Sequence, residues 1–432
     1  MAGSSSRRTI GDYFTLQRGT TYKSRLLGVP GPVLLGLATI QRNGGFRRDS
    51  LRTYGGDSPD KLLVQPGELY LSLKDVTQSA DLLGAVARLP RDHPPGRLTQ
   101  DTVKLEPRAA DIPLDYLYWL LRTPQYRGYC RSHATGTTNL GLAREDFLAF
   151  PAPEPTRAQL RIVDTLTALD DKIELNRRMI ETLEAMARSL FKSWFVEFDP
   201  VRAKAEGRDP GLPKLVADLF PARFVDSELG ELPEGWEVGK LGDVAEHPRR
   251  GVQAESIDPD MPYIALEHMP KRCVALSDWG VAKGLESNKY EFRKGEILFG
   301  KLRPYFHKVG VAPIDGVCST DIVVVAPQEP HWFAFVLGLV SSDKFVEYTN
   351  AGSTGTKMPR TSWADMARYE LARPPTLIAS AFTEMIRPSV ERIIAGIHES
   401  RSLAALRDAL LPKLISGELR VKHAEKFIGR AV

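Results

Sequence analysis

The residues that come closest to a catalytic motif form an incomplete phosphate-binding loop. Gly295, followed after four residues by Gly300 and Lys301, matches the spacing of a P-loop, in which backbone N–H groups and a lysine hold nucleotide phosphates. The next residue is Leu302, where a P-loop needs Ser or Thr to bind Mg²⁺. The intervening Glu-Ile-Leu-Phe is typical of a β-strand. We therefore expect no nucleotide site here.

Other motifs of catalytic chemistry are missing as well. Arg373-Pro-Pro-Thr376 lacks the Asn or Asp of a methyltransferase tetrapeptide, and no Gly-x-Gly-x-x-Gly opens a helix. The eight histidines are scattered, and none pairs with Cys or Glu at metal-ligand spacing. The chain has three widely spaced cysteines, Cys130, Cys273 and Cys318. Their number and spacing exclude a disulfide framework and a cysteine-based zinc site, and they indicate a reducing cytoplasm. We expect no catalytic residue, no metal site and no cofactor in this chain.

Composition narrows the class of protein further. A chain of 432 residues with 42% hydrophobic and 26% charged residues is expected to form two or three globular domains. The longest apolar run, Trp332–Val340, is too short to span a membrane, and no apolar stretch follows the N-terminus as in a signal peptide. The net charge is +4, but residues 1–155 carry 20 Lys and Arg against 15 Asp and Glu. This basic bias favours a nucleic-acid partner without proving one.

An internal repeat organises the chain. Gly67-Glu-Leu-Tyr-Leu-Ser-Leu-Lys74 corresponds to Gly295-Glu-Ile-Leu-Phe-Gly-Lys-Leu302, and Ala134-Thr-Gly-Thr-Thr-Asn139 corresponds to Gly352-Ser-Thr-Gly-Thr-Lys357. Each half consists of short strand signals with Gly and Pro between them, one helical stretch and a Pro-rich exit. The repeat therefore predicts two copies of an α+β module.

A helical pattern follows each module. Apolar residues at alternating spacings of four and three, with one Asn among them, predict a coiled-coil seam: Leu166, Leu169, Ile173, Asn176, Ile180, Leu183 and Leu190. An amphipathic helix packed on its own domain is the alternative. The second pattern begins near Ile386 and slips after Ser400. Two such helices can pair antiparallel, which predicts a pseudo-twofold arrangement of module, helix, module and helix.

The predicted boundaries follow from these changes of pattern. They are a first module at 1–156, a first helix at 157–195, a linker at 196–240, a second module at 241–376, a second helix at 377–416 and a C-terminal tail at 417–432.

The duplicated modules, the helix after each and three local strings resemble the specificity (S) subunits of type I restriction–modification systems. The strings begin at Leu190-Phe-Lys-Ser-Trp, Leu229-Gly-Glu-Leu-Pro and Ala409-Leu-Leu-Pro-Lys. The resemblance covers essentially the whole chain. It implies a non-catalytic subunit whose modules are target recognition domains, each reading one half of a split, asymmetric site in double-stranded DNA.

The same resemblance implies partners. The paired helices would set the gap between the half-sites and dock modification (M) subunits, which carry S-adenosylmethionine and methylate adenine. A restriction (R) subunit would add ATP- and Mg²⁺-dependent cleavage. A seam of about 40 Å, at 1.5 Å per residue, is close to the roughly 34 Å of one turn of DNA.

Basic and polar loop residues are the candidate DNA contacts. Arginine binds guanine with two donors, Gln and Asn bind adenine, and lysines neutralise phosphates. In the first module the candidates are Gln41, Arg42, Asn43, Arg47, Arg48, Thr137, Thr138 and Asn139. In the second they are Lys271, Arg272, Lys301, Arg303, Tyr305, His307, Lys308, Thr356 and Lys357. The alternatives are solvated basic loops, structural Thr-Gly-Thr turns and, for Tyr305, a core position.

Two other classes of protein remain open at this stage. One is a helical scaffold protein that binds protein partners through its two modules. The other is an enzyme whose site has no recognisable motif.

Overall fold

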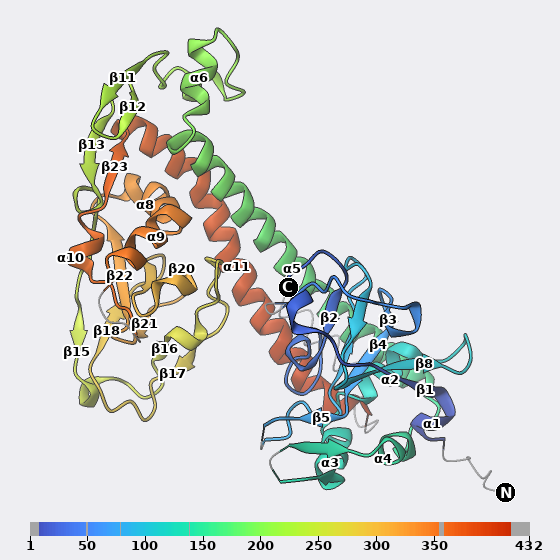
Figure 1. Ribbon diagram of the computed structural model, residues 1–432. Helices are drawn as coiled ribbons and strands as arrows, with labels where there is room; N and C mark the ends of the chain where they lie inside the picture. Colours follow the sequence, from blue (N-terminus) through green and yellow to red (C-terminus); the bar gives the residue numbers. More distant parts are fainter. Residues whose placement is uncertain (1–7, 49–50, 78, 138, 354–357, 416–432) are drawn as a thin grey trace, which may run out of the picture. The chain divides into compact units, whose positions relative to one another are not determined.

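The computed structural model describes residues 8–48, 51–77, 79–137, 139–353 and 358–415. The chain divides into two compact units, one made of Met1–Asp171 with Ala404–Val432 and the other of Lys172–Leu403. Each unit combines helices with small sheets (Figure 1), so the predicted α+β class is confirmed. The division falls inside two long helices rather than at the predicted module boundaries.

The first unit is built around a four-stranded antiparallel sheet in the order β1-β8-β4-β6. These strands are β1 (Phe14–Arg18), β8 (Thr102–Pro107), β4 (Leu69–Ser72) and β6 (Val86–Arg88). Two three-stranded sheets accompany it: β2 (Val33–Leu35), β7 (Gly96–Leu98) and β3 (Leu63–Val64); and β5 (Lys74–Asp75), β10 (Leu140–Leu142) and β9 (Ala134–Thr135). The short helices are α1 (Ile10–Tyr13), α2 (Leu114–Leu120), α3 (Pro124–Ser132) and α4 (Arg144–Ala149).

The second unit has a four-stranded sheet in the order β14-β22-β19-β20. Its strands are β14 (Ala245–Glu246), β22 (Ile322–Pro327), β19 (Ile297–Gly300) and β20 (Val309–Val311). A five-stranded sheet contains β15 (Gly251–Val252), β18 (Lys289–Phe292), β21 (Gly316–Cys318), β16 (Pro262–Ile264) and β17 (Gly280–Val281). The remaining elements are β13 (Glu237–Lys240), which pairs with β23 (Glu370–Arg373), and the helices α8 (Phe333–Val340), α9 (Asp343–Ala351) and α10 (Trp363–Met366).

The two units share a strand order. In each four-stranded sheet the edge strand that comes first in the chain, β1 or β14, pairs with the strand that comes last, β8 or β22. That strand pairs in turn with β4 or β19, which is followed by the other edge strand, β6 or β20. Each unit also contains one parallel pair, β2 with β7 and β16 with β21, next to an antiparallel partner, β3 or β18. Parallel pairs need a long crossover, so the same combination in the same order supports a duplicated module.

Residues 196–240 fold as part of the second unit, whereas the sequence predicted a linker. They contain α6 (Asp199–Ala205), α7 (Lys214–Ala217) and the hairpin of β11 (Phe224–Ser227) with β12 (Gly230–Pro233). Phe198 and Trp236 are buried, with their ring centroids 5.4 Å apart. Burying aromatic surface is favourable, which explains why this segment packs on the core instead of remaining extended.

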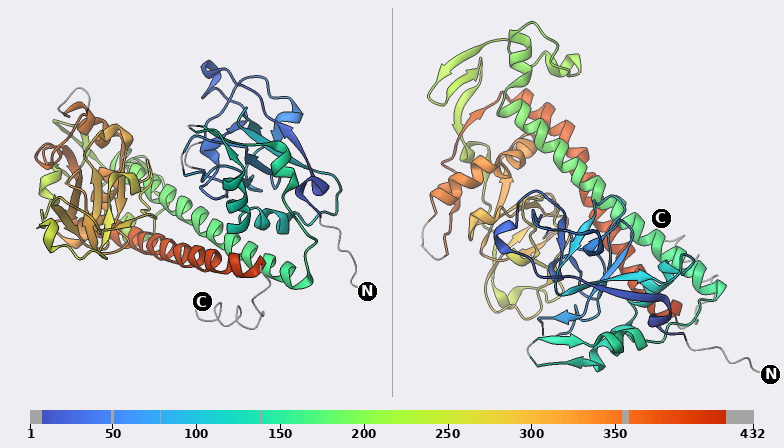
Figure 2. Two further views of the ribbon diagram at one scale, coloured as in Figure 1. Left: turned by 90° about the horizontal axis from the view of Figure 1, so that it is seen from below. Right: turned by 45° about the vertical axis from the view of Figure 1, so that its right-hand side comes forward.

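Two long helices follow the modules, α5 (Arg157–Phe195) and α11 (Thr376–Ile415). Thr156 begins α5 because its hydroxyl accepts from the Gln159 N–H at 3.3 Å, while Gln159 Oε1 accepts from the Thr156 N–H at 2.9 Å. Within the second unit the helices lie side by side and antiparallel (Figures 1 and 2). Ile180 of α5 packs there with Ile393 and Ile397 of α11.

The predicted seam residues are buried or half-buried along α5. Leu166, Leu169, Asn176 and Ile180 are buried, and Ile173, Leu183 and Leu190 are half-buried. In the second unit the stripe contacts more than α11, because Ile180 also packs with Ala275 and Leu190 packs on the module's aromatic core. The seam there is shared between the partner helix and the module.

Candidate nucleic-acid interface

The Thr-Gly-Thr turn of the first unit lies beside a basic side chain. It joins β9 to β10, and β10 pairs on its other side with β5. Lys74, the first residue of β5, places Nζ 3.0 Å from Asp101 Oδ1. Thr137 and Asn139 are exposed, whereas Thr138 lies outside the described residues. Exposed hydroxyl and amide groups next to a cation are suited to DNA phosphates.

The second unit repeats this arrangement with the cation on the opposite segment. Arg360 and Leu302 form an isolated β-bridge, which corresponds to the pairing of Gly141 in β10 with Lys74 in β5. The Arg360 guanidinium lies 2.9 Å from Asp321 Oδ1. Lys301 donates its backbone N–H to the Asp321 carbonyl at 2.9 Å. The predicted contacts of the turn itself lie outside the described residues: Thr356 and Lys357.

Positive charge accumulates around Lys301. Burial lowers the pKa of its ammonium, Asp321 opposes this effect, and Arg360 and Arg249 reinforce it. The pKa of His247 is lowered too, chiefly by burial, while its Nδ1–H donates to the Val324 carbonyl at 2.8 Å. Several cations around one carboxylate produce a positive potential that attracts an anionic partner.

The basic and aromatic segment from Lys301 to Lys308 is only partly available to a partner. Tyr305 is 50% exposed, whereas Arg303 is half-buried. His307 is buried, and its Nε2 lies 2.9 Å from the Ser341 carbonyl, so the structure directs this predicted base contact into the module. Lys308 is half-buried, and its ammonium donates to the Leu266 carbonyl. The two backbone contacts hold this segment against the module.

Four of the predicted DNA contacts in the Gly-rich loop of the first unit are exposed. Gln41, Arg42 and Asn43 lie at the tip of the loop, and Arg47 follows further along the chain. Arg48 is half-buried, lies 2.8 Å from Asp92 and stacks over Phe46, so it supports the loop. Gly44 adopts φ +108°, and a Cβ there would lie 3.0 Å from Arg122 Cγ. The glycine therefore lets the loop approach the end of α2.

The loop at Lys271 and Arg272 occupies the same place in the second unit. Each loop follows a parallel strand, β2 or β16, and a short 3₁₀ turn. Asn43 and Arg272 are both left-handed, with φ of 62° and 55°, and each donates its N–H to a carbonyl further along its own module. Lys271 is exposed, with Nζ 4.3 Å from the Phe306 ring centroid, and Arg272 lies 2.7 Å from Asp343.

The structure also exposes a loop that the sequence analysis missed. Tyr22, Lys23 and Arg25 are exposed after β1. Beneath them the buried Arg97 donates to Thr20 Oγ1 at 3.0 Å and to the Thr21 carbonyl at 3.2 Å. An aromatic residue next to basic residues, the signal that singled out Lys301–Lys308, is also present here and could have identified this loop.

Comparison with known proteins relates about three quarters of the chain to one class. It is 28% identical over 326 residues to the type I restriction enzyme MjaIX specificity subunit of Methanocaldococcus jannaschii, covering 72% of this chain and 70% of the relative. It is 26% identical over 373 residues to the HindI specificity subunit of Haemophilus influenzae, covering 73% and 79%. These relatives are specificity subunits of type I restriction enzymes. The resemblance predicted from the sequence is thus confirmed.

A solved structure supports the fold. The S subunit of a type I restriction–modification system from M. genitalium matches with a TM-score of 0.54 at 15% identity, covering 96% of this chain and 97% of that one. No protein-family model matches the chain. The agreement with a specificity subunit therefore extends to the arrangement of helices and sheets.

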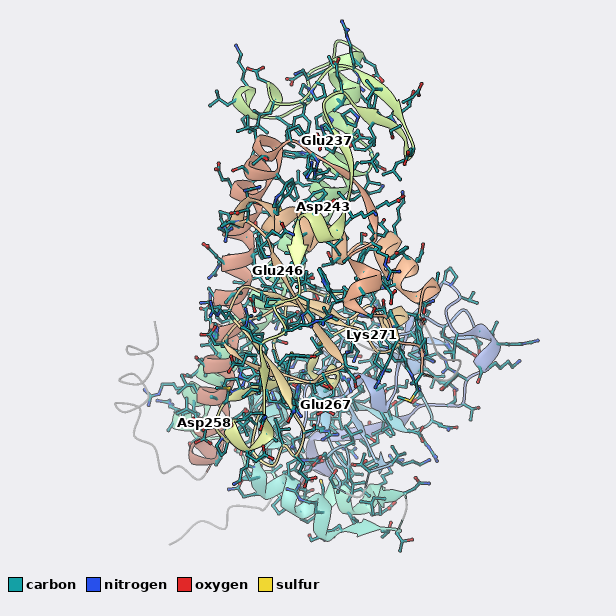
Figure 3. All side chains as sticks on the ribbon, turned by 90° about the vertical axis from the view of Figure 1, so that its left-hand side faces the viewer. Glu237, Asp243, Glu246, Asp258, Glu267 and Lys271 are labelled. Carbon is teal, nitrogen blue, oxygen red and sulfur yellow. The ribbon has the colours of Figure 1, made fainter. Side chains whose placement is uncertain are left out.

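Three exposed carboxylates lie in a row on the second unit, and the first of them, Glu237, is paired with Arg373. Glu237, Asp243 and Glu246 follow one another along β13, the next turn and β14, and all three are exposed (Figure 3). Carboxylates repel the phosphates of DNA, so these three residues are not candidate phosphate contacts.

The described ranges contain neither a cluster of metal ligands nor a membrane-spanning helix. Among those residues, no group of three or more His, Cys, Asp or Glu side chains could hold a metal ion. None of the helices in these ranges combines the length and apolar character that crossing a membrane requires.

Proposed function

We propose that this chain is the non-catalytic DNA-recognition subunit of a type I restriction–modification complex. Each module would read one half of a bipartite, asymmetric site in double-stranded DNA. The observation that carries this proposal is the repeated pairing of a carboxylate with a cation in both units. Asp101 and Asp321 occupy corresponding places, and each pairs with a cation, Lys74 or Arg360, from one of the two facing segments. A shared phosphate-binding base with different loops around it suits two readers of different sequences.

The long helices suit a spacer and a docking surface. A helix of 39 residues, the length of α5, is about 58 Å long at 1.5 Å per residue. Leu175 and Met186 of α5 are 59% and 56% exposed, which offers apolar surface to protein partners. We expect modification and restriction subunits to bind there and to supply S-adenosylmethionine, ATP and Mg²⁺, because no motif for these groups was recognised in this chain.

The test is binding of the full-length chain, alone and with the modification subunit of its system, to duplexes randomised over two separated blocks. We expect enrichment of two unlike half-sites at one fixed gap, with affinity that falls steeply as salt rises because phosphate contacts release counterions. Binding without sequence preference would contradict the proposal. Salt-insensitive binding of protein partners alone would favour the scaffold alternative.

A further inference from the structure

A buried carboxylate joins the spacer helix to the second module. Glu184 of α5 is 7% exposed, and its Oε1 accepts hydrogen bonds from the backbone N–H groups of Val274 at 2.9 Å and Ala275 at 2.8 Å. The Cys273 thiol donates to the same oxygen at 3.3 Å. Three donors on one oxygen hold residues 273–275 against a single point of the helix.

The other end of this segment is fixed to α11. The Arg401 guanidinium lies 3.6 Å from the Trp279 ring centroid and donates to the Ser277 carbonyl at 3.1 Å. We call residues 273–279 the strap. Because the strap is bound to both helices of the second unit, its position is determined by the helix pair as well as by its own module.

The strap directly follows the exposed basic loop. Arg272 donates its N–H to the His307 carbonyl at 2.8 Å, and its own carbonyl lies 3.5 Å from Arg188, one helical turn beyond Glu184. Only two peptide units separate Arg272 from the Val274 N–H. A change at the Glu184 contact therefore moves the backbone that carries Lys271 and Arg272.

The corresponding loop of the first unit is supported differently. There the buried Gly44 meets the Arg122 side chain, and the Gly45 N–H donates to the Val86 carbonyl at 2.8 Å. Among the described contacts of Gly44 and Gly45, none is to a carboxylate of α5. Arg122 in turn pairs with Asp170 of α5 at 2.9 Å, so the first loop reaches a helix carboxylate only through a side chain, whereas the strap backbone of the second module binds Glu184 directly.

We propose that Glu184 is a positioning residue for DNA reading by the second module: by fixing the strap, it orients Lys271 and Arg272 toward their half-site. This inference rests on the proposed function. It predicts that a residue of the spacer helix, buried and away from the exposed loops, controls sequence preference in one half-site and leaves the other unchanged.

The experiment compares the full-length wild type with Glu184→Ala, Glu184→Gln and Glu184→Asp, using duplexes randomised in both blocks. Glu181→Ala, at an exposed position of the same helix, is the matched control. Glu184→Ala should weaken preference in the second half-site by at least about fivefold, as expected when base contacts are displaced. Preference in the first half-site should not change. Glu184→Gln keeps an acceptor oxygen and should behave as the wild type.

Hydrogen exchange of the Val274 and Ala275 amides provides a second measurement. These amides should exchange faster in Glu184→Ala and not in Glu184→Gln. If Glu184→Ala does not fold, Glu184→Asp shortens the side chain and should give a smaller loss in the same half-site. Faster exchange with unchanged preference, or equal losses in both half-sites, would overturn the inference. A wild type without two half-sites would instead contradict the proposed function itself.

Discussion

Asn176 of α5 donates from Nδ2 to Glu399 Oε2 of α11 at 2.9 Å, across the antiparallel helix pair of the second unit. The same amide lies 3.3 Å from Ser400 Oγ, and Asn176 is 1% exposed. A polar residue in an apolar seam specifies register, because any shift along the helices leaves it without a partner. This contact therefore fixes which turns of the two helices face each other.

Replacing Asn176 with Ala should lower the free energy of unfolding by about 1–3 kcal/mol, because Glu399 loses a buried donor. Urea unfolding followed by circular dichroism measures this change. Thr182→Ala, at an exposed position of α5, should stay within about 0.5 kcal/mol of the wild type. Equal effects of the two substitutions would mean that the seam contact does not contribute to stability.

Replacing Arg122 with Ala should destabilise the first unit by about 3 kcal/mol. Its guanidinium is almost buried and lies 2.9 Å from Asp170 and 3.0 Å from the Tyr118 hydroxyl. Without Arg122, the half-buried Asp170 carboxylate keeps only one of its described cationic partners, Arg407, at 2.6 Å. Tryptophan fluorescence during urea unfolding reports the change through Trp119. Arg42→Ala, at a largely exposed arginine, is the control and should have little effect.

Stability should depend on pH through Glu184. Burial raises the pKa of its carboxyl above the ordinary 4.5, so the folded state holds the proton more tightly than the unfolded state. The contribution of Glu184 to the free energy of unfolding should therefore fall as the pH rises above 4.5, and level off beyond the raised pKa. Glu184→Gln lacks this titration, so its stability advantage over the wild type should grow across the same range. Unfolding at a series of pH values, with Glu181→Gln as control, measures it. A constant difference would contradict the expectation.

Replacing Lys301 with Ala should reduce the salt dependence of DNA binding by about one unit in the slope of log affinity against log salt. The reason is that Lys301 lies in the cation cluster with Arg249 and Arg360. Fluorescence anisotropy at several salt concentrations gives the slope. Glu246→Gln, at an exposed carboxylate of β14, should leave the slope unchanged. An unaltered slope for Lys301→Ala would place this cluster away from the phosphates.

Lengthening both long helices should lengthen the gap in the DNA site. Inserting four residues near Leu169 of α5, with a matched insertion near Arg407 of α11, adds about 6 Å, or close to two base-pair steps of about 3.4 Å. Selection from the randomised duplexes should return the same half-sites at a longer gap. Altered half-sites at the old gap would refute the role of the helices as a spacer.

The long helices and the class of fold were predictable from the sequence. Periodic apolar residues and the Thr156 cap determine where α5 begins, and these signals are local. The repeat likewise predicted two modules of one kind. These patterns are reliable because burial of an apolar stripe or strand depends on residue type and spacing more than on distant contacts.

The candidate contacts were less predictable because loop geometry decides which side chains face outward. His307 follows Tyr305 at strand-like spacing, but the chain between them is a 3₁₀ turn flanked by left-handed Arg303 and His307, which directs the imidazole inward. Asn43 and Arg272 occupy corresponding positions in the two units, but they are residues of different types, so sequence alone does not align them. Only strand pairing and backbone conformation reveal the correspondence.

The first unit also has a consequence for the order in which the protein is made. Arg407 and Asp170 form an ion pair inside this unit, yet they are separated by 237 positions in the chain. The second unit is one continuous segment, Lys172–Leu403. A ribosome therefore completes every residue of the second unit before it supplies Arg407. Until Arg407 is made, Asp170 can pair only with Arg122 among its described partners, so this contact of the first unit forms after the whole of the second unit has been synthesised.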